Sequence, residues 1–146
     1  MPALTLMISL GSALLATASF LPSSLPPNPT INQPWTVTGF TESGPDGQEV
    51  ATFRVTAPDD YVTGVRGLNV LCESVPYALE WDTECASDAT FRLEASVSYQ
   101  ESYPRVLFKL NHVQIDANSV TIVTGEDFVL PADIFELTPE SVSIGL

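Results

Sequence analysis

Apolar residues recur at every second position through much of this chain from Trp35 onward. Successive side chains of a β-strand point to opposite faces, so this period indicates strands with one buried face. No stretch of a dozen residues shows a convincing period of 3.6, so we predict an all-β protein. The clearest alternating run places these residues on one face: Phe91, Leu93, Ala95, Val97 and Tyr99.

Seven segments have the length and composition of short strands. They span 35–40, 49–57, 67–73, 90–100, 105–115, 119–125 and 141–146. Pro45-Asp46-Gly47 separates the first two and predicts a hairpin, with the proline at the second position of the turn. Seven or more strands with turns between them predict a single antiparallel β-sandwich or β-barrel.

Two local features depart from this simple pattern. In 105–115 the apolar phase shifts by one position after Leu110, which predicts a bulge near Asn111 and His112. Short helical turns fit only near 131–135 and in the loop before Trp81.

The amino terminus has the composition of a secretory signal. Residues 2–21 carry no charged side chain, and Ala16-Thr17-Ala18 resembles a cleavage pattern. We expect residues 1–18 to be removed and the protein to be extracellular; the alternative is a retained anchoring segment. Residues 19–34 contain five prolines and no charge, which predicts a leader that is poorly ordered or laid across the domain surface. Residues 35–146 form the expected β-domain.

The charge balance excludes some classes of partner. Eighteen acidic residues oppose five basic ones, giving a net charge of −13. Such a surface repels the phosphates of nucleic acids and anionic lipids. We therefore expect no nucleic acid as a partner, and no membrane after signal cleavage. Cys72 and Cys85 are the only two cysteines, and in a secreted chain they most simply pair with each other.

The segment CESVPYALEWDTEC between these cysteines could be a chemical site or a stapled piece of scaffold. Residues two apart in a strand lie roughly 7 Å apart on one face. Glu80, Asp82 and Glu84 would then match the spacing of about 6.5–9.5 Å in inverting glycosidases. Such a pair normally flanks a cleft, however, whereas adjacent carboxylates are best solvated. We favour scaffold, with a core-facing row of Leu79, Trp81, Thr83 and Cys85.

The remaining candidates for chemistry are few. The single histidine, His112, could act as a general base, but without partners it fits a hydrogen-bonded strand residue better. The pairs Asp59-Asp60 and Glu126-Asp127 lack EF-hand spacing and fit solvated turns, so we expect no metal and no other cofactor.

Tyrosines suggest a second kind of site. Tyr61, Tyr77 and Tyr103 fall in loop-like places and are candidates for stacking against a sugar or another ligand. Ordinary loop packing explains them equally well. Tyr99 continues the buried row of its strand, so we expect it in the core.

The cysteine segment and the strand that follows it resemble the Alternaria major allergen family of secreted fungal proteins. The matching elements lie within 35–110 and are Trp35, Cys72, Trp81, Cys85 and Phe91. The resemblance implies a compact β-barrel, secretion by a fungus and a role as effector, elicitor or allergen without catalytic residues. This chain lacks the family's second disulfide and the extra cysteine that can link subunits, so no covalent dimer is expected.

These observations lead to two hypotheses. The first is a secreted, non-catalytic effector-like or allergen-like protein that binds a host protein, another extracellular partner or a small ligand. The second is a secreted carbohydrate-binding module or a small glycoside hydrolase.

Overall fold

The computed structural model describes residues 28–78, 82–99 and 105–146, which form nine strands and no helix. The strands are β1 (Trp35–Ser43), β2 (Val50–Ala57), β3 (Leu68–Pro76), β4 (Thr83–Ser87), β5 (Phe91–Tyr99), β6 (Val106–Asp116), β7 (Ser119–Val129), β8 (Ile134–Leu137) and β9 (Ser141–Gly145). The prediction of an all-β protein with seven or more strands is confirmed. The prediction of a short helical turn near 131–135 is wrong, because this region enters β8.

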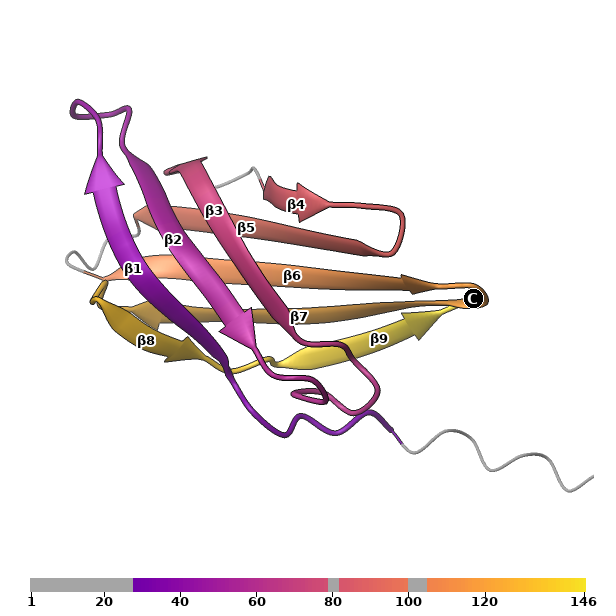
Figure 1. Ribbon diagram of the computed structural model, residues 1–146. Coiled ribbons are helices and arrows are strands. Elements are labelled where there is room, and N and C mark those ends of the chain that lie inside the picture. The colour runs from indigo at the N-terminus through magenta and orange to yellow at the C-terminus, as the bar shows by residue number, and fades with distance from the viewer. Residues whose placement is uncertain (1–27, 79–81, 100–104) are drawn as a thin grey trace, which may run out of the picture.

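The strands form two antiparallel sheets packed face to face (Figure 1). One sheet has the order β3-β2-β1-β8 and the other has the order β4-β5-β6-β7-β9. Strands β1, β2 and β3 run obliquely across β5, β6 and β7 (Figure 1). The architecture is thus a sandwich and not a closed barrel, which decides between the two predicted forms.

The core lies where the inward rows of the two sheets meet. Ala51, Phe53 and Val55 of β2 are fully buried, as the alternation predicts. Phe53 and Phe108 make an edge-to-face contact between the sheets, with ring centroids 4.8 Å apart. In β5 the predicted inward row is confirmed at its centre, whereas its end residues Phe91 and Tyr99 are only half-buried.

The strand register is regular where a bulge was predicted. Pairing of β6 with β5 and β7 continues without a shift through Asn111 and His112, so the predicted bulge is wrong. His112 itself takes the inward position after Leu110, and Val113 lies on the opposite face of the strand, where it is also buried. The apolar phase changes because a polar side chain occupies a core position, not because the backbone slips.

Bulges occur at three other places. Register shifts lie between Thr38 and Thr41 in β1, between Ala51 and Phe53 in the β2–β3 pair, and between Glu84 and Ala86 in β4. In β1 the bulge contains Gly39, whose φ of +63° lies in the left-handed region that favours glycine.

The hairpin between β1 and β2 forms at the predicted sequence. The backbone N–H of Gln48 donates to the carbonyl oxygen of Pro45 at 2.9 Å, and Gly47 has a φ of +81°. Pro45 is therefore the first residue of the turn and not the second, as we expected. Gly47 takes the third position, where a positive φ is needed.

The expected leader is partly described. The backbone N–H groups of Asn32 and Gln33 donate to the carbonyl oxygen of Tyr61, and Ile31 forms an isolated bridge with Val62. Residues 31–33 thus lie across the β2–β3 loop. The expected signal segment, 1–18, lies outside the described residues.

Trp35 occupies the place where β1 of one sheet meets β7 of the other. Its side chain is fully buried, and Gly125 of β7 lies beneath it. A Cβ atom on Gly125 would come within 2.7 Å of Trp35 Cζ3 and 2.8 Å of the Thr138 carbonyl oxygen. Glycine is therefore required here by the close approach of the indole and not by backbone conformation.

We predict that Gly125→Ala destabilises the protein by about 1–3 kcal/mol, because the added methyl group overpacks the junction beneath Trp35. Urea unfolding followed by tryptophan fluorescence measures the loss. Gly145→Ala is the matched control, since a Cβ there meets nothing within 4 Å. Equal stability of the two variants would show that the indole can move aside.

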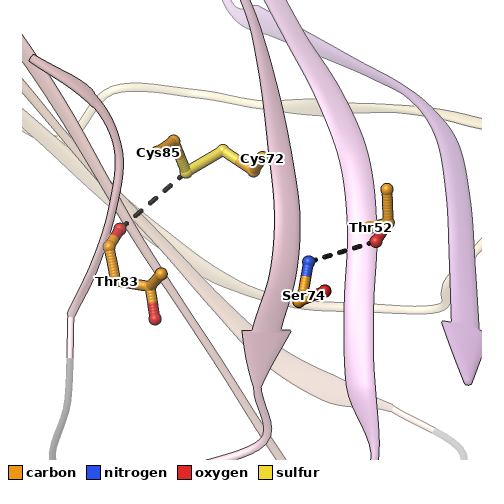
Figure 2. Close-up of a disulfide and its surroundings, with 5 residues drawn as sticks. All are labelled: Thr52, Cys72, Ser74, Thr83 and Cys85. Carbon is orange, nitrogen blue, oxygen red and sulfur yellow. Dashed lines mark hydrogen bonds between the residues drawn. A yellow bond between two sulfur atoms is a disulfide. The ribbon is translucent and has the colours of Figure 1, made fainter. Parts of the chain in front are cut away.

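A disulfide joins the two sheets along one side of the sandwich. Cys72 of β3 and Cys85 of β4 are bonded, which confirms the predicted pairing (Figure 2). Ser74 beside it has a positive φ of 53°, and its backbone N–H donates to Thr52 Oγ1 at 3.2 Å. This bulge lets Cys72 and then Val75 both face the core, although they are three residues apart.

We predict that reducing this disulfide lowers the stability by about 3 kcal/mol and the melting temperature by roughly 10 °C. The bond closes a loop with a sequence separation of 13 residues and thereby reduces the conformational entropy of the unfolded chain. Calorimetry with and without a phosphine reductant provides the measurement, and the chain has no other cysteine to react. An unchanged melting temperature in fully reduced protein would contradict the prediction.

Candidate functional site

The β2–β3 loop closes one end of the core with apolar side chains. Tyr61, Val62 and Val65 of this loop are all buried. Tyr61 packs against Trp35 with the two rings tilted by 44° and their centroids 5.8 Å apart. Of the two interpretations of Tyr61, loop packing therefore holds, and the ring is not accessible to a ligand because the loop folds inward over the sandwich.

Tyr61 and His112 form a buried polar pair. The Tyr61 hydroxyl lies 2.6 Å from His112 Nδ1, and the two rings stack with centroids 5.9 Å apart. Either neutral tautomer of the imidazole satisfies this bond, because a hydroxyl both donates and accepts. His112 is thus the hydrogen-bonded strand histidine that we predicted, and Tyr61 is the partner that the sequence did not show.

Burial keeps this pair neutral. Burial and, to a smaller extent, the positive charge of Arg66 lower the pKa of His112 to about 4. Burial also raises the pKa of Tyr61 well above its usual range, although the Trp35 side chain opposes this effect. Within 28–78, 82–99 and 105–146, no acceptor has hydrogen-bond geometry with the buried Trp35 Nε1.

A second tyrosine cluster lies on the surface. The rings of Tyr77 and Tyr99 stack with centroids 4.4 Å apart and planes 11° apart. Tyr77 donates to Glu42 Oε2 at 3.0 Å and Tyr99 donates to Glu42 Oε1 at 2.6 Å. The expectation that Tyr99 is a core residue is only half met, since its ring is half-buried. Tyr103, the third predicted stacking residue, lies outside the described residues.

The acidic set between the cysteines is on the surface where it is described. Asp82 and Glu84 are exposed, as predicted. Asp82 Oδ2 accepts from Asn111 Nδ2 at 3.2 Å and lies 3.9 Å from Lys109 Nζ on the outer face of β6. Glu80 and Trp81 lie outside the described residues. The arrangement of Asp82 and Glu84 fits scaffold, because each carboxylate contacts solvent and neighbouring polar groups.

The other acidic pairs differ from each other. Asp59 and Asp60 lie in the β2–β3 loop, as predicted, at an open hollow of about 330 Å³. Their carboxylates accept from the backbone N–H groups of Gly67 and Gly64, respectively. Glu126 and Asp127 are both exposed but lie within β7, so their assignment to a turn is wrong. Among the described residues, no group of three or more potential metal ligands occurs.

Three exposed apolar side chains lie within seven residues at the end of β7, in the β7–β8 connection and at the start of β8. Phe128 is 42% exposed, Leu130 is 54% exposed and Ile134 is 67% exposed. We predicted neither a strand nor a binding segment at 126–136, because its apolar residues alternate too weakly with polar ones. The composition nevertheless distinguishes this segment as both apolar and acidic, since carboxylates flank the apolar residues and no Lys or Arg occurs between 126 and 136.

No family model, curated protein or solved structure matches this chain. The similarity to the Alternaria major allergen family therefore depends on the sequence features given above. In the part of the chain that the structure describes, no helix is long and apolar enough to span a membrane.

We predict that the stability of the native state falls as the pH decreases from about 6.5 to about 4. Unfolded histidine has a pKa near 6.5, whereas the pKa of folded His112 is about 4. Between these values the unfolded state binds the proton and the folded state does not, so acid favours unfolding. The contribution is fully present above pH 6.5 and is on the order of 3 kcal/mol.

An NMR titration of the imidazole tests this directly, because the chain has one histidine. The control is His112→Gln, whose unfolding free energy should fall less than that of the wild type over the same pH range. A folded-state midpoint near 6.5 would contradict the prediction.

Proposed function

We propose that this chain is a secreted, non-catalytic binding protein of the effector-like or allergen-like kind, and that its partner is a host or other extracellular protein. One observation carries the proposal: Phe128, Leu130 and Ile134 are exposed within seven residues. Exposed apolar side chains that cluster in one segment, with polar residues around them, are typical of protein-interaction surfaces.

The charge around this segment suggests what the partner presents. The carboxylates of Glu126, Asp127, Asp133 and Glu136 surround the apolar side chains in sequence, and all four are exposed. A partner with an apolar recess flanked by Lys or Arg would match both features. The net charge of −13 would speed its approach at low ionic strength. The Cys72–Cys85 disulfide is compatible with an oxidising compartment.

Two matched variants test this proposal, and in each of them three exposed apolar residues are replaced by serine. One variant carries Phe128→Ser, Leu130→Ser and Ile134→Ser. The control carries Leu71→Ser, Ile144→Ser and Leu146→Ser, whose side chains are also exposed. Both variants should fold, because none of the six residues is buried.

We expect immobilised wild-type protein and the control variant to capture the same protein from host extracellular fluid. The first variant should bind it at least tenfold more weakly, because apolar anchors at an interface typically contribute more than about 1–2 kcal/mol. Binding should also weaken as salt is added. Equal capture by both variants would contradict the proposed surface, and no capture by the wild type would contradict the function.

A second candidate is a carbohydrate-binding module or a small glycoside hydrolase. The stacked rings of Tyr77 and Tyr99 beside the Glu42 carboxylate favour it, since sugars are bound by aromatic faces and carboxylates. A glycan array and a hydrolysis screen distinguish the two candidates. Glycan binding lost in Tyr77→Ala but kept in the Phe128, Leu130 and Ile134 variant would favour the second.

A further inference from the structure

The stacked tyrosines belong to opposite sheets and are held there by the backbone. Tyr99 is the last residue of β5, and Tyr77 directly follows β3. Tyr77 forms an isolated parallel bridge with Val97, and the backbone N–H of Ala78 donates to the Val97 carbonyl oxygen at 3.1 Å. The contact between the two rings, with centroids 4.4 Å apart, therefore does not depend on side-chain rotamers alone.

Glu42 aligns the two rings in the same direction. Its two carboxylate oxygens accept one hydrogen bond from each tyrosine, so both hydroxyl groups lie at the same end of the stack. Burial and the Glu42 carboxylate raise the pKa of Tyr99 to about 12. Burial, Glu42 and Tyr99 together raise the pKa of Tyr77 above its usual range. Both phenols are thus protonated at neutral pH, and each has a proton acceptor in place.

We propose that Tyr77 and Tyr99 are a site of oxidative coupling, at which a haem peroxidase and hydrogen peroxide join the two rings as dityrosine. The carbon atoms next to each phenolic carbon carry much of the unpaired electron of a phenoxyl radical. Because the hydroxyl groups lie together, these carbons also lie near each other in the stack. Glu42 is a positioning residue and the first acceptor of the phenolic protons.

The proposed reaction balances as a two-electron oxidation. Each tyrosine loses one electron to the peroxidase and its phenolic proton through Glu42, which gives two phenoxyl radicals. The two unpaired electrons form one carbon–carbon bond between the rings. The hydrogen on each bonded carbon then moves to an oxygen and restores two phenols. Hydrogen peroxide takes up the two electrons and two protons and forms two molecules of water.

The product would be a second covalent link between the sheets. The existing disulfide joins β3 to β4, and the new bond would join the end of β3 to the end of β5. Both links lie along the same side of the sandwich, where β3 contacts β4 and β5. Unlike the disulfide, the carbon–carbon bond is not broken by thiols, so it would hold the two sheets together in a reducing environment.

The test treats the wild-type protein with a plant haem peroxidase and hydrogen peroxide and isolates the monomer by size exclusion. We expect dityrosine fluorescence and a mass loss of two hydrogen atoms in this fraction. Trypsin should then yield 67–92 joined to 93–105, which contain Tyr77 and Tyr99, respectively. Dityrosine that occurs only in covalent dimers would contradict the proposal, because it would come from collisions between molecules.

Conservative variants assign the coupled residues. Tyr77→Phe and Tyr99→Phe keep the rings but should lose the intramolecular product. Tyr103→Phe is the control and should keep it, which is needed because Tyr99 and Tyr103 share a tryptic peptide. Glu42→Gln should slow the coupling several-fold. Persistence of the product in Tyr77→Phe or Tyr99→Phe, or its loss in Tyr103→Phe, would overturn the assignment.

A stability measurement gives a readout that does not depend on the variants. After reduction of the disulfide, the coupled protein should melt at a higher temperature than the uncoupled protein, because the β3–β5 link replaces part of the lost constraint. Equal melting temperatures of the two reduced samples would show that the new bond does not join the sheets.

Discussion

The burial of two inward rows of side chains against each other is the constraint on which this structure depends. Phe53 and Phe108 contact each other from opposite sheets, and Trp35 fills the space over Gly125. Neither sheet could bury its apolar face alone, because a single antiparallel sheet leaves both faces open to water. The two sheets must therefore form together. The disulfide then joins β3 and β4, the edge strands of the two sheets.

Two polar side chains of β6, His112 and Gln114, are buried and have their partners in one loop. His112 takes an inward position in β6 because the β2–β3 loop brings the Tyr61 hydroxyl to it. Gln114, two residues further on, accepts from the backbone N–H of Arg66 and donates to the Gly64 carbonyl oxygen in the same loop. One loop thus both covers the end of the sandwich and satisfies the polar residues of the strand beneath it.

The proposed functions use surface features that serve the fold in different ways. Phe128 and Ile134 flank the connection that carries the chain from one sheet to the other, and their exposure contributes little to the core. The Tyr77–Tyr99 stack, in contrast, helps to hold β3 near β5. A binding surface can therefore change without loss of stability, whereas a change at the tyrosine stack affects both sheets.

The sequence by itself determined seven of the nine strands, the core rows, the first hairpin and the disulfide, because a period of two, turn residues and two cysteines are local signals. It failed for β4 and β8, which are too short to show a period, and for Tyr61, which lies in a polar loop. Only the tertiary structure decided that the sheets form a sandwich and that Tyr61 meets His112 and Tyr77 meets Tyr99. These pairs are 51 and 22 residues apart in the chain, and contacts at such separations depend on how the sheets pack.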